Sequence, residues 1–221
     1  MACPPRDTVH AMNYLLYISA AICAYLIAGW NPAITLSRAV YKKDIREYGS
    51  GNAGFTNFKR SFGMRLAWVV RVLDLCKAAV VVSVFASLFE RTLGLWQLGA
   101  AYTGFIAVLG HAFPIWYGFK GGKGIAATAG LILAIHPAFI PMGVILFFGT
   151  FLLTHYVSLG SLLVYAGFLI EMVIMGQMDL FSMPVGHRAE MYVIAAFLTA
   201  MAYWKHRENI KRLLSGTERK T

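Results

Sequence analysis

The chain has 221 residues, of which 58% are hydrophobic and only 14% are charged. Soluble globular proteins are closer to half apolar and a quarter charged, so the composition argues against a soluble domain and predicts a single polytopic, all-α membrane domain over residues 1–221. The net charge of +10 would suggest nucleic acid in a soluble protein. No common nucleic-acid-binding motif is present, and a bilayer with anionic headgroups accounts for the charge.

Apolar residues fall into seven segments, which predict about seven transmembrane helices, since a spanning helix needs about 20 largely apolar residues. The segments are Tyr14–Leu36, Leu66–Phe89, Leu95–Trp116, Gly124–Ile135, Ala138–Leu153, Ser158–Met175 and Met191–Trp204. The fourth is too short to cross a bilayer upright. Because Pro137 ends or kinks a helix, the fourth and fifth segments are either two elements or one bent helix.

Residues 1–13 are interpreted as an N-terminal extension. They lack the basic region, short apolar core and small-residue cleavage site of a signal peptide. We therefore expect the first apolar segment to be retained as a helix.

Basic residues predict the orientation of the chain. They concentrate in residues 42–65, in the loop that holds Lys120 and Lys123, and in an amphipathic tail over residues 205–221. With seven spans these three regions lie on one side of the membrane, which the positive-inside rule assigns to the cytoplasm. We expect the N-terminus outside, the C-terminus in the cytoplasm, and a multi-pass protein of the bacterial inner membrane.

The first candidate site is the loop over residues 44–60. Its glycines alternate with hydroxyl and amide side chains, and it ends in Lys59-Arg60. Such a loop can surround an oxyanion with backbone and side-chain donors. A flexible polar connector would explain the glycines and serine, but not the concentration of donors.

The second candidate site combines residues 110–114, GHAFP, with residues 119–124, FKGGKG. Glycines allow close backbone approach to a ligand, and lysines add positive charge at the same place. Walker A spacing would require glycine at Tyr117 and a hydroxyl residue at Gly124, so we expect no nucleotide. Topology alone would explain the lysines but not the glycines.

The third candidate site is the tail over residues 206–218, which is expected to continue the last helix. His206 and Asn209 are three residues apart and share a helical face. An ordinary interfacial helix explains the pattern equally well. Ser158 is either a hydroxyl donor or a helix cap. Asp74 and Lys77 are expected to form a structural ion pair, because charges at membrane depth usually pair, and a direct role in the site is the alternative.

These motifs resemble those of the bacterial acyl-phosphate-dependent glycerol-3-phosphate acyltransferases. The resemblance rests on SGNAGFTNFKR at 50–60, GHAFP and FKGGKG, and HRENIKRLLSGTE at 206–218, and it spans about Tyr14 to Glu218. It implies a seven-helix enzyme that moves a fatty acyl group from acyl phosphate to the 1-hydroxyl of glycerol 3-phosphate. One departure is Phe55, where alanine is usual.

The resemblance implies roles for individual residues. The predicted catalytic set is Ser50, Lys120, His206 and Asn209. The predicted substrate-binding set is Asn52, Gly54, Thr56, Asn57, Arg60, His111, Gly121, Gly122, Lys123, Gly124 and Ser158. We expect no metal and no cofactor, and a monomer whose partners are acyl phosphate, glycerol 3-phosphate and the lipid bilayer.

The chemistry agrees with direct displacement. Acyl phosphate carries a good leaving group, so the reaction needs an oriented hydroxyl and charge stabilisation rather than a covalent intermediate. None of the six histidines is followed by Asp after four intervening residues, so the His-x4-Asp motif of thioester-dependent acyltransferases is absent. Removing one oxyanion donor costs on the order of a hundredfold in rate, and we predict this for Asn209→Ala and Lys120→Ala.

Two other function classes stay open on the residues alone. Broken apolar segments also occur in anion transporters, but here the donors gather at one predicted face. A lipid-binding scaffold would explain the basic tail but not the two glycine-rich loops. Formation of lysophosphatidic acid by the purified protein separates all three.

Overall fold

The computed structural model describes residues 6–181 and 183–220. Within these ranges the regular structure is helical throughout. The longitudinal helices are α1 (Arg6–Gly29), α4 (Met64–Leu93), α5 (Trp96–Ala112), α6 (Ile125–Ile135), α9 (Val157–Gln177) and α10 (Val185–Lys205). A broken element runs beside them, made of α7 (Phe139–Val144), a π-helical turn η3 (Ile145–Gly149) and α8 (Thr150–Thr154).

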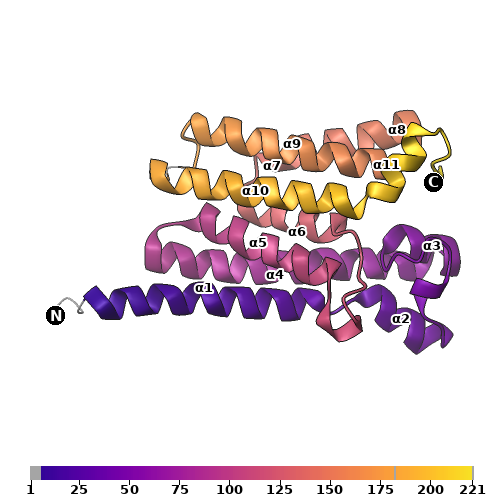
Figure 1. Cartoon of the computed structure of the whole chain (residues 1–221), viewed down its shortest axis with the longest axis horizontal. Coiled ribbons are helices and arrows are strands. Elements are labelled where there is room, and N and C mark those ends of the chain that lie inside the picture. Colours follow the sequence, from indigo (N-terminus) through magenta and orange to yellow (C-terminus); the bar gives the residue numbers. More distant parts are fainter. Residues whose placement is uncertain (1–5, 182, 221) are drawn as a thin grey trace.

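Short elements gather at one end of this bundle (Figure 1). They are α2 (Pro32–Tyr41), the 3₁₀ turn η1 (Ile45–Glu47), α3 (Phe55–Phe62), the 3₁₀ turn η2 (Ile115–Tyr117) and α11 (Arg207–Leu214). The two chain ends lie at opposite ends of the bundle, and the C-terminal end lies beside these short elements. The three predicted site regions thus meet at one end.

Among the described residues, four segments are long and apolar enough to cross a membrane: Ala11–Tyr41, Met64–Leu93, Trp96–Tyr117 and Val157–Gln177. Ile125–Ile135 and Phe139–Thr154 are shorter apolar helices. Each predicted apolar segment overlaps a longitudinal helix or the broken element beside them, but the count of seven spans stays a prediction.

Helix boundaries differ from the sequence-based segments at three places. The segment Tyr14–Leu36 is two helices, because the Asn31 side chain accepts from Ile34 N–H and Pro32 opens a new helix as its first residue. Of the predicted extension over residues 1–13, residues 1–5 lie outside the described ranges and helix α1 already begins at Arg6. The tail is not a smooth continuation of α10, since α11 begins anew after His206.

The open question at Pro137 is resolved in favour of two elements. α6 ends at Ile135, His136 is extended with φ −167° and ψ 135°, and α7 begins at Phe139. The residue before a proline is pushed out of the helical region by the proline ring. The break turns the chain back, so that α7, η3 and α8 run beside α9.

Small residues bring the helices into close contact. A Cβ added at Gly110 of α5 would lie 2.4 Å from the Tyr25 carbonyl oxygen of α1, and one at Gly130 of α6 would lie 2.5 Å from the Leu75 carbonyl oxygen of α4. Membrane helices associate through such close backbone approaches. They fix the ends of α5 and α6, from which the second motif loop extends.

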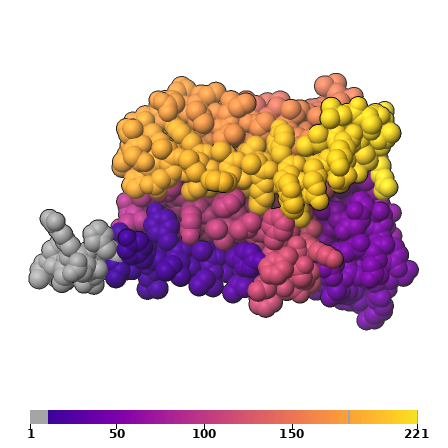
Figure 2. Space-filling model, in the orientation of Figure 1, coloured from indigo at the N-terminus to yellow at the C-terminus, as the bar shows by residue number. Residues whose placement is uncertain are grey.

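The C-terminal segment covers one end of the molecule and lies against the region of residues 42–65 (Figure 2). The Arg60 guanidinium donates to the backbone carbonyls of Arg219 and Lys220 at 3.3 and 3.4 Å. The first and third motif regions are therefore direct neighbours.

Candidate active site

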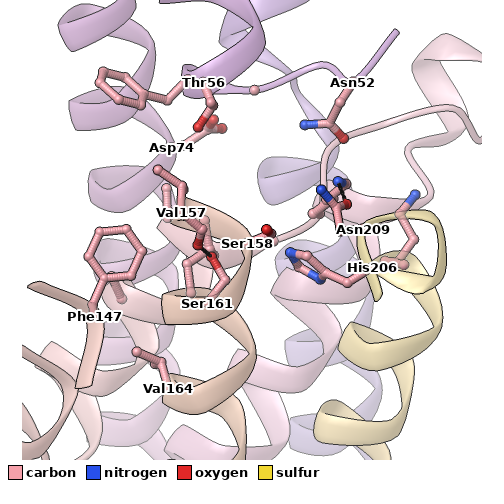
Figure 3. A pocket seen from close by; sticks show the side chains of 18 of the residues that line it. Asn52, Thr56, Asp74, Phe147, Val157, Ser158, Ser161, Val164, His206 and Asn209 are labelled. Carbon is pink, nitrogen blue, oxygen red and sulfur yellow. Dashed lines mark hydrogen bonds between the residues drawn. The ribbon is translucent and has the colours of Figure 1, made fainter. Parts of the chain in front are cut away.

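A cleft of about 770 Å³ opens at the end of the bundle where the three motifs meet. One half is lined by polar motif residues and the other by apolar side chains of α6, α7, η3 and α9. Figure 3 shows Asn52, Asn209 and His206 around the polar half, with Phe147 and Val164 in the apolar half. The site therefore joins two chemically different compartments.

Most of the predicted site residues line this cleft. They are Ser50, Asn52, Gly54, Thr56, Arg60, His111, Gly121, Lys123, Gly124, Ser158, His206 and Asn209. The exceptions are Asn57, Lys120 and Gly122, which lie outside its lining.

Asn57 shapes the first loop instead of facing the cleft. Its side chain is buried, its Oδ1 accepts from Ser50 N–H at 2.8 Å, and its Nδ2 donates to the carbonyls of Ile45 and Tyr48 at 3.2 and 2.9 Å. Gly49 beside it has φ +59°, and a Cβ there would meet Asn57 Oδ1 at 2.3 Å. The amide thus holds the loop that carries Ser50.

The second loop rests on His111. Gly122 N–H donates to the His111 carbonyl at 3.2 Å, and a Cβ at Gly122 would lie 2.2 Å from His111 Nε2. Gly124, with φ +91°, precedes the first residue of α6. Unpaired N–H groups at a helix start favour an anion. The glycines therefore allow a close backbone approach, as the sequence suggested. At Gly122 the backbone approaches the buried His111 rather than a ligand.

The two lysines of this loop face different spaces. Lys123 Nζ donates to Asn209 Oδ1 in the main cleft. Burial, with help from the nearby Arg212 charge, lowers the pKa of Lys123 to about 8. Lys120 lies instead along a second cavity of about 680 Å³, which Arg46 and Arg207 also line. Lys120 therefore lies outside the lining of the main cleft, and its catalytic role stays a prediction.

His111 belongs to a buried charged cluster with Asp74 and Lys77. Asp74 Oδ1 lies 2.8 Å from Lys77 Nζ and 3.2 Å from His111 Nδ1. Lys77 also donates to the Trp30 carbonyl at the end of α1. The predicted Asp74–Lys77 ion pair is confirmed, and its contact with His111 was not foreseen, since i,i+3 spacing says nothing about a partner on another helix.

His206 is 3% exposed, and its Nδ1 donates to the Ala202 carbonyl at 2.8 Å. In the neutral ring this leaves Nε2 as a proton acceptor. Burial, and then the Lys123 charge, lower the pKa of His206 to about 4. The imidazole is therefore neutral at pH 7 and chemically suited to accept a proton.

Glu218 joins the third motif to α9. Its carboxylate accepts from Ser158 Oγ at 2.9 Å, Asn209 Nδ2 at 2.7 Å and Arg212 Nε at 2.7 Å. Burial alone would raise the pKa of Glu218, but these donors hold it below the usual value. Glu218 was absent from the predicted site set, although it belongs to the quoted motif. A carboxylate in a basic tail gives no sign of folding back onto Asn209.

The apolar half of the cleft is lined by Ile132, Leu133, Ile140, Val144, Phe147 and Val164. The π-helical turn η3 carries Phe147 toward it, while its neighbour Phe148 also lines the space. No sequence signal marks this half, because an apolar groove residue resembles any other membrane-helix residue.

The comparisons with known proteins agree with this architecture. The glycerol-3-phosphate acyltransferase family model matches residues 18–216. Glycerol-3-phosphate acyltransferases of Mycoplasmopsis synoviae (strain 53) and Clostridioides difficile (strain 630) are 39% and 38% identical to the chain. Each alignment covers 95% of this chain, together with 95% and 97% of the respective relatives.

Two solved structures are similar over nearly the whole chain. One is PlsY (YgiH), an integral membrane glycerol 3-phosphate acyltransferase, in its glycerol 3-phosphate form, with 30% identity and a TM-score of 0.80. That similarity covers 93% of this chain and 95% of PlsY. The lysphosphatidic acid form of PlsY gives 28% identity and a TM-score of 0.76, with 92% and 94% of the two chains covered. The protein is thus a membrane acyltransferase, and it belongs to the glycerol-3-phosphate acyltransferase family.

Proposed function

We propose that the protein transfers a fatty acyl group from acyl phosphate to the 1-hydroxyl of sn-glycerol 3-phosphate. The products are 1-acylglycerol 3-phosphate and inorganic phosphate, and the reaction begins phospholipid synthesis. The observation that carries this proposal is the single cleft that joins a cationic polar half to an apolar half. Such a cleft suits two phosphate groups and one acyl chain together. The names of the relatives support glycerol 3-phosphate as the acceptor.

The polar half supplies binding groups of the required kinds. Arg60, Lys123 and Arg212 contribute positive charge, and Ser50 and Thr56 contribute hydroxyl groups. The remaining predicted binding groups are Asn52, Gly54, Gly121, Gly124 and Ser158, with Asn57, Gly122 and His111 holding the loops. Charge-assisted hydrogen bonds to phosphate are the strongest contacts available to this set.

The reaction is proposed as a direct displacement. The 1-hydroxyl oxygen attacks the acyl carbonyl carbon, and the carbon–oxygen bond to the phosphate breaks. The hydroxyl proton passes to His206 Nε2, or to the departing phosphate with His206 only orienting the hydroxyl. Asn209 and Lys123, joined by a hydrogen bond in the cleft, stabilise the developing negative charge. No metal or cofactor takes part in this scheme.

Lys120 has a separate proposed role. It lies on the second cavity beside Arg46 and Arg207, so its charge raises the local concentration of anionic substrate rather than touching the reacting atoms.

We also propose the orientation in the membrane. The basic loops lie at the end of the bundle where the described chain finishes, opposite the start of α1 (Figure 1), and residues from them line the cleft. A cytoplasmic active site, an outside N-terminus, seven crossings of the bacterial inner membrane and a monomeric enzyme are consistent with this arrangement and with the positive-inside rule. Protection of cysteines placed singly at the two ends from a membrane-impermeant reagent tests the orientation.

The decisive assay supplies purified protein with a long-chain acyl phosphate and radiolabelled glycerol 3-phosphate. We expect lysophosphatidic acid and inorganic phosphate in equal amounts, and no acyl-enzyme after rapid quenching. Parallel reactions use acyl-coenzyme A and acyl carrier protein thioesters. Turnover with a thioester but not with acyl phosphate would overturn the proposed donor.

A further inference from the structure

Arg71 is a cation in the wall of the cleft whose only described contacts are with aromatic rings. Its guanidinium carbon lies 5.2 Å from the Phe55 ring centroid, 5.6 Å from that of Trp68 and 5.7 Å from that of Phe147. Among the residues that the structure describes, no carboxylate forms an ion pair with it. Asp74, one turn away on α4, is taken by Lys77 and His111.

Such an arrangement leaves the charge incompletely compensated. Ring faces attract a guanidinium, but a partly buried cation is fully stabilised only by an anion with matching hydrogen-bond acceptors. The N–H groups of Arg71 donate no hydrogen bond to any residue that the structure describes, and guanidinium N–H groups match phosphate geometry in two parallel bonds. A phosphate-bearing ligand would supply what the protein itself does not.

Arg71 also stands at a side opening of the cleft. α4 packs mainly on α5 and α6, whereas η3 packs mainly on α9, so the contact between Arg71 and Phe147 spans two separately packed parts. Leu133, Val144 and Phe148 line the cleft and are 46%, 48% and 47% exposed. The cleft therefore opens toward the lipid-facing surface of the bundle.

We propose that Arg71 binds the phosphate of a single-chain amphiphile that passes between the bilayer and the cleft through this side opening. The amphiphile is either the acyl phosphate donor on its way in or the acylated product on its way out. In Figure 3 Phe147 lies beside Val157 and Val164, away from Asn209 and His206. Arg71, held against Phe147, is thus a specificity-determining residue for the chain-bearing ligand rather than for glycerol 3-phosphate. The two named ligands rest on the proposed function.

Binding without turnover provides the first test. Hexadecylphosphonate, which cannot transfer a chain, is titrated into the protein in nanodiscs, with methylphosphonate as the chainless comparison. Arg71→Gln is expected to raise the Kd for hexadecylphosphonate roughly tenfold, because one charge-assisted contact is lost. The Kd of Arg71→Lys is expected to lie between the values of the wild type and Arg71→Gln. The matched control is Arg65→Gln, which removes the same charge from an exposed position on α4. Equal Kd values for Arg71→Gln and wild type would overturn the proposal.

Kinetics identify which amphiphile is bound. If Arg71 receives the donor, Arg71→Gln raises KM for acyl phosphate and leaves KM for glycerol 3-phosphate and kcat within about twofold. If it releases the product, the inhibition constant for lysophosphatidic acid rises instead. Either result supports the proposal, whereas a parallel rise in KM for glycerol 3-phosphate contradicts it. Should the wild type make no lysophosphatidic acid from acyl phosphate, the proposed donor fails while the phosphonate titration still decides the role of Arg71.

Discussion

The two halves of the cleft are built on different principles. In the polar half, each motif is tied to another part of the chain, as Glu218 is to Ser158 and Lys123 to Asn209. In the apolar half, side chains such as Val164 and Leu133 define a shape with no directional bonds. The first half is fixed by hydrogen bonds and charges, and the second by packing alone. We therefore expect sharp losses from single changes in the first half and graded shifts in the second.

The largest expected effect is the loss of Asn209. Its amide accepts from Lys123 and donates to Glu218, so Asn209→Ala removes a charge-stabilising group and disconnects the tail. We expect kcat to fall on the order of a hundredfold or more, measured by lysophosphatidic acid formation. The exposed Lys211 on the same helix provides the control, since Lys211→Ala should keep near-normal turnover. A near-normal rate for Asn209→Ala would contradict the proposed role of the polar half in the acyl transfer.

The two lysines of the second loop allow a comparison between a residue that lines the cleft and one that does not. Lys123 reaches the cleft and Lys120 does not. Lys123→Ala is expected to cost on the order of a hundredfold in kcat, as for an oxyanion donor. Lys120→Ala, predicted from sequence to cost as much, is now expected to cost roughly tenfold in kcat/KM, an effect that salt weakens because it acts at a distance. Equal, salt-independent losses would restore Lys120 to the catalytic set.

The pH profile tests the electrostatics of the polar half. The pKa of Lys123 is lowered to about 8, so its charge is present below that pH and lost above it. We expect kcat/KM for glycerol 3-phosphate to fall roughly tenfold per pH unit on the alkaline side. Lys123→Arg should move this limb to higher pH, because arginine stays charged. An unmoved alkaline limb would show that another group controls it.

The lowered pKa of His206 predicts how the stability of the folded protein depends on pH. Its pKa in the folded protein is about 4, below the ordinary value near 6.5. Between these values the unfolded chain binds the extra proton, so stability is lost as pH falls from about 6.5 toward 4 and is fully present above. Thermal unfolding at several pH values checks this, with His206→Asn expected to flatten the dependence.

The smallest expected effect lies in the apolar half. Val164→Phe narrows the groove without removing a polar contact. The groups proposed to bind glycerol 3-phosphate are left intact, so its KM should stay within about twofold of the wild-type value. Turnover should shift toward shorter acyl phosphates, measured as a ratio of kcat/KM values across chain lengths. A loss of rate equal for all chain lengths would contradict the separation of the two halves.

Sequence patterns indicated residues that line the polar half of the cleft, but none that line the apolar half. Glycines, lysines and His206 stand out against an apolar background, so the cleft contains most of the residues that the motifs indicated. Asn57 was predicted as a ligand group because a motif does not show which way an amide points. Glu218 contacts Ser158 and Arg71 contacts Phe147, and a single sequence does not reveal such distant pairs.

Helix boundaries depend on single residues. Pro137 separates two helices, which was one of the two alternatives that the sequence left open, and Asn31 with Pro32 divides a segment that hydropathy alone had drawn as one. Hydropathy averages over many residues, whereas a cap or a proline acts at one. The helical nature of the apolar segments followed from composition, but the π-helical turn η3 had no signal in the spacing of its side chains.

The buried cluster of Asp74, Lys77 and His111 has a consequence for how the protein assembles. Charges on a lone helix are costly within lipid, so α4 is poorly suited to the bilayer until α5 brings His111 and α1 offers the Trp30 carbonyl. The same histidine supports the loop at Gly122. Packing of α1, α4 and α5 during assembly therefore buries the Asp74–Lys77 ion pair and positions the substrate loop in the same step. A bundle in which these helices have not yet packed would also be inactive.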